Sequence, residues 1–222
     1  DTKEKKNIRK AFNLAIKAHQ NTRRESGKLY ISHPISVAKI VSNDIGLGPT
    51  SIICSLLHDV VEDTHITLED IEKEFGREKK IIISGLTKIS GVVDKDVSLQ
   101  AENFRKMILS ISNDIRVVLI KIADRLDNMR TLQYLRKNKQ ERIASETLYL
   151  YAPLAHRLGL YSIKTELEDL SLKHTESDVY FNISQKLNET KDNREKYIKK
   201  FTKPIKDKLK KEAITCSIKG RP

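Results

Sequence analysis

The chain has 222 residues and a formal net charge of +12, and 38% of its residues are hydrophobic. This length suits one generous domain, or one domain with a fragment of another, and it supplies enough apolar side chains for a core. No apolar run reaches the roughly 18 residues that a membrane-spanning helix needs, so we expect no membrane partner. The two cysteines, Cys54 and Cys216, lack metal or redox spacing, which predicts a reducing, cytoplasmic location.

Apolar residues at helical spacing predict a series of helices in chain order. Ile8 and Phe12 mark the first amphipathic helix. Pro34, at a favoured first-turn position, opens the second helix, and Gly46 ends it. Ser51, or the threonine before it, begins a third helix that we expect to continue through the sequence LLHDVVEDT.

The remaining elements continue the helical pattern. Thr67 has the sequence context of a capped helix start, and Gly76 that of its end. We expect a long loop over residues 87–100, and strand-like alternation occurs only at Ala213–Lys219. The class is therefore all-α for roughly the first 180 residues. Further helices are predicted over 78–86, 99–112, 113–135, 138–151 and 153–172.

The basic charge is concentrated at the end of the chain. Residues 186–222 contain 13 Lys or Arg and 5 Asp or Glu, a net charge of +8, and the preceding 185 residues carry only +4. A basic stretch can indicate nucleic-acid binding. The stripe of Ile198, Phe201, Ile205 and Leu209 within it is better explained by packing. We therefore do not expect nucleic acid as a primary partner.

The segment LLHDVVEDT gathers four ionisable side chains beside an apolar run. On one continuous helix, His58, Asp59, Glu62 and Asp63 would share the face opposite the apolar residues. An ordinary surface helix would give the same pattern. However, an adjacent imidazole and carboxylate suit a divalent transition metal, which needs further ligands from elsewhere in the chain.

Two other segments offer such ligands. His33 lies where a polar loop meets the second helix, although a histidine before proline is also a common turn or capping residue. Asp124, Asn128 and Thr131 are spaced at i, i+4 and i+7, so they lie on one helix face. Asp124 could alternatively pair with a neighbouring Lys or Arg.

Together these segments resemble the HD superfamily of metal-dependent phosphohydrolases, whose pattern is H…HD…D. Longer strings resemble the hydrolase domain of the bifunctional RelA/SpoT family over about residues 7–180. They include RRESGKLYISHPISVAKIV, LLHDVVEDT, GLTKIS, SLQAENFRKM, IKIADRLDNMRTL and YAPLAHRLGLYSIKTELEDLS. The final ITCSIKGRP is similar to the opening of that family's synthetase domain. The resemblance implies an HD-type helical bundle over 1–185, and a linker helix with a truncated α/β synthetase start over 186–222.

The resemblance also implies a set of site residues. One Mn²⁺ would be bound by His33, His58, Asp59 and Asp124, although Fe²⁺ accepts the same ligands. Glu62 and Asp63 would handle protons in catalysis. The substrate-binding residues would be Arg24, which stacks on the guanine base, together with Ser26, Asn128 and Thr131.

Two positions depart from the family pattern. Glu25 stands where the family often has a second basic residue, and Asp127 stands where it often has histidine. The first departure affects how strongly this loop can stack on the guanine base. The second adds negative charge near the mouth of the site, and we expect no contact between Asp127 and the metal.

The expected activity is hydrolysis of the alarmone (p)ppGpp to GDP or GTP and pyrophosphate, without synthesis. The expected partners are this nucleotide and the downstream synthetase and regulatory domains of a full-length protein. Two alternatives stay open: an HD phosphohydrolase acting on another nucleotide, such as dGTP or NADPH, and a catalytically silent regulatory domain. Degenerate ligands would mark the latter, and all four ligands and both acids are present.

Overall fold

The computed structural model describes residues 2–90 and 114–216, and the chain divides into two compact units, Asp1–Thr175 and Glu176–Pro222. The regular secondary structure of the described residues is helical in both units, and their only β-pairing is an isolated bridge between Arg23 and Leu29. None of the described helices has the length and apolar character to cross a membrane. The expected all-α class is confirmed for these residues.

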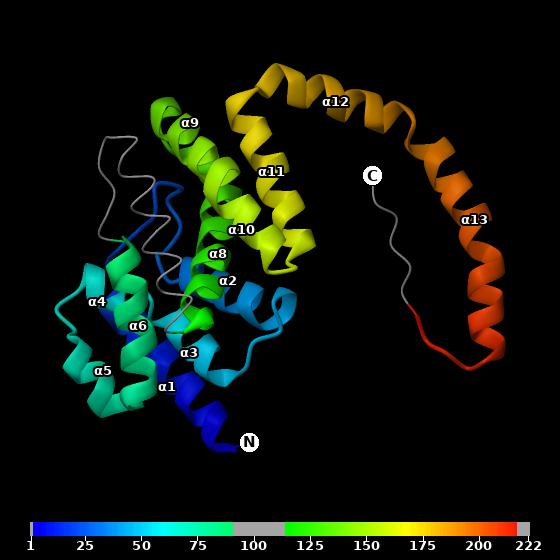
Figure 1. Cartoon of the computed structure of the whole chain (residues 1–222). Coiled ribbons are helices and arrows are strands. Elements are labelled where there is room, and N and C mark those ends of the chain that lie inside the picture. The colour runs from blue at the N-terminus through cyan, green and yellow to red at the C-terminus, as the bar shows by residue number, and fades with distance from the viewer. Residues whose placement is uncertain (1, 91–113, 217–222) are drawn as a thin grey trace. The chain divides into compact units, whose positions relative to one another are not determined.

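The described helices of the first unit follow one another in chain order. Figure 1 shows them from blue to yellow along the chain. In order they are α1 (Thr2–Ala18), α2 (Ser32–Lys39), α3 (Pro49–Leu56), α4 (Val60–Asp63), α5 (Leu68–Phe75), α6 (Arg77–Ser90), α8 (Ile115–Arg130), α9 (Lys137–Glu146), α10 (Ala152–Arg157) and α11 (Tyr161–Thr175). Two π-helical turns, Ile40–Asp44 and Thr147–Tyr151, extend α2 and join α9 to α10.

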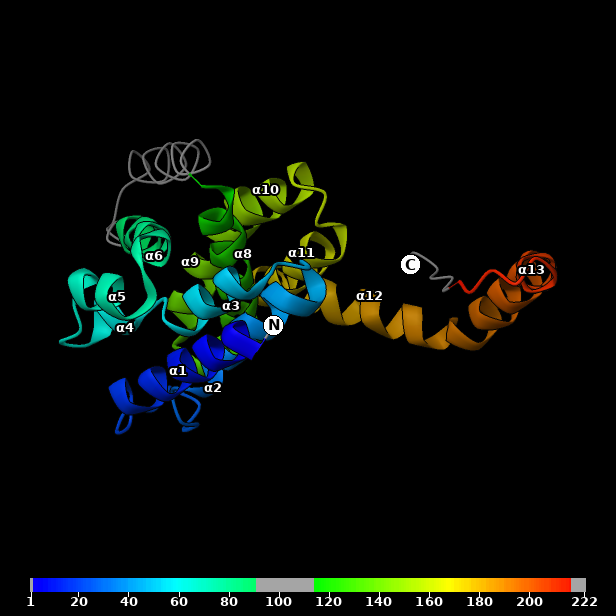
Figure 2. The same cartoon turned by 90° about the horizontal axis from the view of Figure 1, so that it is seen from below.

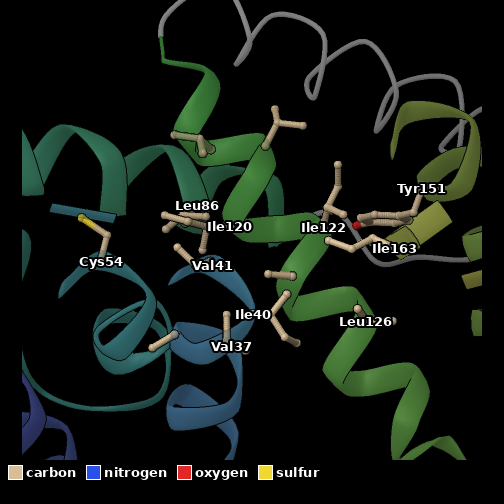
Figure 3. Packing of buried hydrophobic residues seen from close by; sticks show 14 of the residues in the cluster. Val37, Ile40, Val41, Cys54, Leu86, Ile120, Ile122, Leu126, Tyr151 and Ile163 are labelled. Atoms are coloured by element: carbon tan, nitrogen blue, oxygen red, sulfur yellow. The ribbon is translucent and has the colours of Figure 1, made fainter. Parts of the chain in front are cut away.

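Helix α8 forms the centre of the first unit. It packs against α2, α3, α6 and α11, and it occupies the middle of this unit in both views (Figures 1 and 2). Figure 3 shows its Ile120, Ile122 and Leu126 among buried side chains of the neighbouring helices. Each such side chain contributes about 1.5–3 kcal/mol through burial. Because α8 is held on several sides, the position of its polar residues is fixed by the core.

Close packing between α6 and α8 depends on a glycine. A Cβ atom added to Gly85 would lie 2.9 Å from Cγ2 of Val117, which is closer than real Cβ contacts. The absence of a side chain therefore lets the two helices approach each other. This contact fixes the beginning of α8 upstream of its polar face.

Several predicted boundaries are confirmed and others are wrong. The Thr67–Asp70 capping box is present at the start of α5. The helix predicted over 153–172 is broken, because Gly159 adopts a φ of 76° between α10 and α11. Helix α6 continues through Ser90, so the expected loop begins later than residue 87. The rest of that loop and the whole of the predicted helix 99–112 lie outside the described residues.

The second unit consists of α12 (Ser177–Glu189) and α13 (Lys191–Lys211). No residue of α12 is buried, and Phe181, Tyr197 and Phe201 are more than half exposed. Residues 213–216 form no strand, and the remainder of the strand predicted over 213–219 lies outside the described part. The expected domain boundary at 185/186 falls inside α12, whereas the compact units divide ten residues earlier, between Thr175 and Glu176.

Candidate metal centre and substrate pocket

Four side chains from three parts of the first unit converge on one point. His33 comes from the start of α2, His58 and Asp59 from the turn between α3 and α4, and Asp124 from α8. Nε2 of His33 lies 3.1 Å from Oδ1 of Asp124 and 3.7 Å from Oδ2 of Asp59. Nε2 of His58 lies 3.0 Å from Oδ2 of Asp59 and 3.8 Å from Oδ1 of Asp124. The predicted convergence is therefore present in the fold.

The expectation of one continuous helix through this motif is wrong. Helix α3 ends at Leu56, and Leu57, with φ −109° and ψ 5°, leaves helical geometry. A new turn begins when the Asp63 N–H donates to the carbonyl of Asp59 at 2.9 Å. Because the chain turns between the two helices, adjacent His58 and Asp59 both reach the same centre.

Each imidazole is oriented through its other nitrogen. The His58 Nδ1–H donates to the Ser55 carbonyl at 2.7 Å, and the His33 Nδ1–H donates to Oδ2 of Asp127 at 2.6 Å. These bonds leave both Nε2 atoms facing the centre. Nε2 of His58 is buried and, although it lies 3.0 Å from Oδ2 of Asp59, it makes no hydrogen bond of good geometry with the described residues. A buried, orphaned nitrogen beside two carboxylates is what a divalent metal site requires of its protein ligands.

The geometry fits a metal by a second measure. One ligand atom each from His33, His58 and Asp124 can be chosen so that all lie within 4.8 Å of one another. Both histidines are almost fully buried. Two imidazole nitrogens and two carboxylates form a mixed donor set that first-row divalent ions accept. The chain therefore offers a site that fits a divalent metal.

The electrostatics of the centre favour charged ligands. Burial would raise the pKa of Asp124, but the Lys121 ammonium and the two histidines hold that pKa well below its usual range. The pKa of Asp59 is likewise low, because His58 outweighs the effect of burial. Burial lowers the pKa of His33, yet its bonds to Asp124 and Asp127 raise the pKa to about 9. Because a histidine ligand must be neutral, a metal that binds here would displace the proton that His33 otherwise holds.

The acidic pair lies beside the centre on α4. Glu62 and Asp63 are exposed and lie about one helical turn after His58 and Asp59. Burial lowers the pKa of Lys121, and the negative charge of Glu62 is among the groups that raise it. Burial raises the pKa of Tyr30, and Asp63 raises it further. The pair therefore borders the cluster from two sides, while its catalytic role stays a prediction.

Sequence reasoning missed several residues that support the centre. The Tyr30 hydroxyl donates to Oδ2 of Asp59, and the buried His19 ring lies 4.4 Å from the Tyr30 ring, centroid to centroid. The pairing of Asp124 with a neighbouring Lys, which the sequence left open as an alternative, is also present: the Lys121 ammonium lies 3.4 Å from Oδ2 of Asp124. No local pattern marked Tyr30 or His19.

A cavity of about 620 Å³ adjoins the centre. All four predicted substrate residues line it: Arg24, Ser26, Asn128 and Thr131. The hydroxyl oxygen of Ser26 is buried without a hydrogen-bond partner among the described residues. Arg23, Arg125 and Arg142, which the sequence did not single out, line the same cavity. The pocket thus combines positive charge with an unused hydrogen-bonding group.

Two residues connect the cavity to the metal centre. Asn128 lines the cavity and donates from Nδ2 to Oδ1 of Asp124 at 2.8 Å. Tyr30 lines the cavity and donates to Asp59. A molecule in the cavity would therefore lie next to the side chains that could hold a metal.

Comparisons with known proteins agree with this geometry. A model of the HD domain matches residues 11–161. A GTP pyrophosphokinase of Myxococcus xanthus is 45% identical over 219 residues, covering 96% of this chain and 29% of its own length. The bifunctional (p)ppGpp synthase/hydrolase SpoT of Escherichia coli K12 is 43% identical, covering 97% of this chain and 31% of its own length. The chain thus spans less than a third of these curated relatives.

A solved structure gives the same result for the fold. It is that of a metazoan ortholog of SpoT, described as hydrolysing ppGpp and playing a role in starvation responses. It matches with a TM-score of 0.58 and 25% sequence identity, covering 74% of this chain and 93% of the other. The chain belongs to the HD domain family, and its similar relatives are of the RelA/SpoT type, as the sequence motifs predicted.

Proposed function

We propose that this HD domain hydrolyses (p)ppGpp at the 3′ position, releasing pyrophosphate and leaving GDP or GTP, with Mn²⁺ as the metal. The observation that carries the proposal is the position of a buried His–His–Asp–Asp cluster next to a cavity lined by arginines. The names of the relatives, which include (p)ppGpp synthase/hydrolase and guanosine-3′,5′-bis(diphosphate) 3′-pyrophosphohydrolase, support the choice of substrate.

The cluster residues would hold the ion, and the rest of the chain would prepare the reactants. Bound there, a divalent ion supplies Lewis acidity and lowers the pKa of coordinated water towards about 7. Tyr30 and Asn128 keep the Asp59 and Asp124 carboxylates oriented through their hydrogen bonds. Glu62 and Asp63, which are exposed beside the cluster, would orient water and accept its proton.

The cavity residues would hold the nucleotide. Arg24 can present its planar guanidinium to the guanine base and still donate hydrogen bonds. The Ser26 hydroxyl has its hydrogen-bonding capacity unused, so it can contact the base or sugar. The exposed Arg23 and Arg142 would supply positive charge for a second diphosphate, whereas Arg125 is paired with Glu146 at 3.0 Å. Guanidinium groups suit bidentate recognition of phosphate.

The choice of Mn²⁺ rests on the donor set together with the family resemblance. Imidazole and carboxylate ligands suit Mn²⁺ or Fe²⁺, whereas Mg²⁺ and Ca²⁺ prefer all-oxygen sites, and the RelA/SpoT resemblance favours Mn²⁺. The low pKa values of Asp59 and Asp124 keep two negative charges in place for a dication. We therefore expect activity to return to the chelated protein with Mn²⁺ and not with Ca²⁺.

We also propose that the second unit leads into further domains of a longer protein. The relatives are more than three times as long as the matched part, and α12 and α13 expose large apolar side chains. A downstream synthetase domain, with regulatory domains beyond it, would fit the RelA/SpoT resemblance. Exposed apolar groups on such helices are typical of a surface that another domain covers.

A direct test incubates the purified, chelated chain with ppGpp and Mn²⁺ and separates the nucleotides by chromatography. The proposal predicts GDP and pyrophosphate, with no product in the His58→Ala variant or without metal. Preference for dGTP or NADPH over ppGpp would identify a different nucleotide phosphohydrolase. Absence of any product in the Mn²⁺-loaded protein would instead indicate a silent regulatory domain.

A further inference from the structure

Asp127 lies between the metal centre and the substrate pocket. It follows Asp124 by three residues on α8 and is only 7% exposed. A single oxygen, Oδ2, accepts the hydrogen bond from Nδ1 of His33 at 2.6 Å and that from Nη1 of Arg24 at 2.9 Å. The sequence-based expectation that Asp127 would only add charge at the mouth of the site was incomplete.

The bond to His33 acts on a prospective metal ligand. A carboxylate that accepts the Nδ1–H fixes the imidazole tautomer and directs Nε2 towards the centre. It also makes Nε2 a better electron donor. His33 is 3% exposed, so no solvent molecule can readily replace this partner. Losing a carboxylate in such a position typically costs about 10–100-fold in metal affinity.

The bond to Arg24 acts on the nucleotide side. Nη1 of Arg24 bonds to Asp127, and Nη2 donates to Oδ1 of Asn128 at 2.5 Å. The guanidinium therefore spans two neighbouring residues of α8, which holds its plane in one orientation. Its side chain is 18% exposed, so one side can still meet a ligand in the cavity that it lines.

We propose that Asp127 is a positioning residue that orients both the metal ligand His33 and the base-stacking Arg24 through one carboxylate oxygen. The proposal rests on the proposed function for the role of Arg24, but its His33 half concerns metal binding alone.

The main experiment compares wild type with Asp127→Asn in the full chain, with Asp178→Asn on exposed α12 as the matched control. Free Mn²⁺ is measured by electron paramagnetic resonance during a titration of each protein. Asp127→Asn should bind Mn²⁺ about 10–100-fold more weakly, and the control should match wild type. Wild-type affinity in Asp127→Asn would overturn the His33 half.

A double-mutant cycle tests the shared role in substrate binding. At saturating Mn²⁺, Asp127→Asn and Arg24→Gln should each raise the KM for ppGpp, while Arg24→Gln leaves Mn²⁺ affinity close to wild type. Adding Asp127→Asn to Arg24→Gln should raise KM no further and should still weaken Mn²⁺ binding. Fully additive effects on KM would show that Asp127 does not act through Arg24.

A measurement on the wild-type protein tests the His33–Asp127 hydrogen bond without requiring any variant to fold. With Zn²⁺, a diamagnetic ion that accepts histidine and carboxylate ligands, nuclear magnetic resonance should show a protected Nδ1 proton on His33. Absence of this proton would overturn the proposal. If the chain does not hydrolyse ppGpp, the proposed function fails, while the Mn²⁺ titration and this signal still decide the His33 half.

Discussion

The metal centre and the nucleotide pocket lie side by side but are built differently. At the centre, His33 and His58 are almost fully buried, and each has its Nδ1 tied to a fixed acceptor. In the pocket, Ser26 has an unused hydroxyl, and Arg142 and Glu25 are exposed. Folding therefore fixes the side chains of the centre, whereas groups in the pocket still have hydrogen-bonding capacity for a ligand.

The difference in burial predicts which residues of the site can change during evolution. A buried, mutually bonded cluster tolerates few replacements, because each loss leaves another group unsatisfied. An exposed pocket residue can change with little effect on folding. Of the two departures from the family pattern, Glu25 lines the pocket and is exposed, whereas Asp127 is buried between the two regions and bonds to both Arg24 and His33. The exposed pocket residues are therefore freer to vary than the buried centre, and Asp127 connects the two.

The strongest challenge to this comparison is removal of a buried ligand. His58→Ala should abolish Mn²⁺ binding and release of pyrophosphate together, because no other described side chain replaces its Nε2. Calorimetric titration with Mn²⁺ and an assay for pyrophosphate measure the two losses. His156→Ala, at an exposed histidine of α10, is the control and should behave as wild type. Full activity in His58→Ala would contradict the assignment of the centre.

A second substitution separates metal binding from catalysis. Glu62→Gln should lower turnover by about 10²–10⁴-fold, the usual contribution of a general acid or base. Mn²⁺ affinity should change little, because Glu62 is exposed beside the cluster and is not one of the four converging side chains. Glu69→Gln, at an exposed position of α5, serves as the control. Unimpaired turnover in Glu62→Gln would remove it from the chemistry.

The pocket should respond to mutation through binding. Arg24→Ala should raise the KM for ppGpp with little loss of turnover, because a cation stacked on a ring contributes about 1–2 kcal/mol to binding. This free energy corresponds to an increase of about five- to thirtyfold. Steady-state kinetics at saturating Mn²⁺ give both parameters. An unchanged KM would mean that Arg24 serves only its contacts with α8.

The smallest expected effect concerns the exposed pocket residue Glu25. Glu25→Lys replaces a negative charge with a positive one beside an anionic substrate, so KM should fall by a few-fold at low salt. The gain should diminish as ionic strength rises, since the side chain is solvent-exposed. A KM that is independent of both the substitution and the salt concentration would show that Glu25 does not face the substrate.

Local patterns predicted part of this structure well. The capping box at Thr67 depends only on residues within one turn, and it is present as expected. The break after Leu56 was missed, because LLHDVVEDT contains neither glycine nor proline. In contrast, Gly159 was visible in the sequence, and its left-handed conformation ends a helix that the apolar spacing predicted to continue.

The candidate site shows the same division. His33, His58, Asp59 and Asp124 could be chosen because their motifs are local strings that resemble a family. The contacts of Asp127 could not, because His33 is 94 residues away and Arg24 is 103 residues away along the chain. Tyr30 likewise reaches Asp59 only through the packing of α2 beside the α3–α4 turn. Such partners depend on tertiary structure and have no short-range pattern.

The most direct test of the central claim is anomalous diffraction from crystals of the chain grown with Mn²⁺. The account predicts one strong peak, bonded to Nε2 of His33, Nε2 of His58 and a carboxylate oxygen of both Asp59 and Asp124. A peak bonded to other residues, or no peak in crystals of protein that hydrolyses ppGpp, would contradict it.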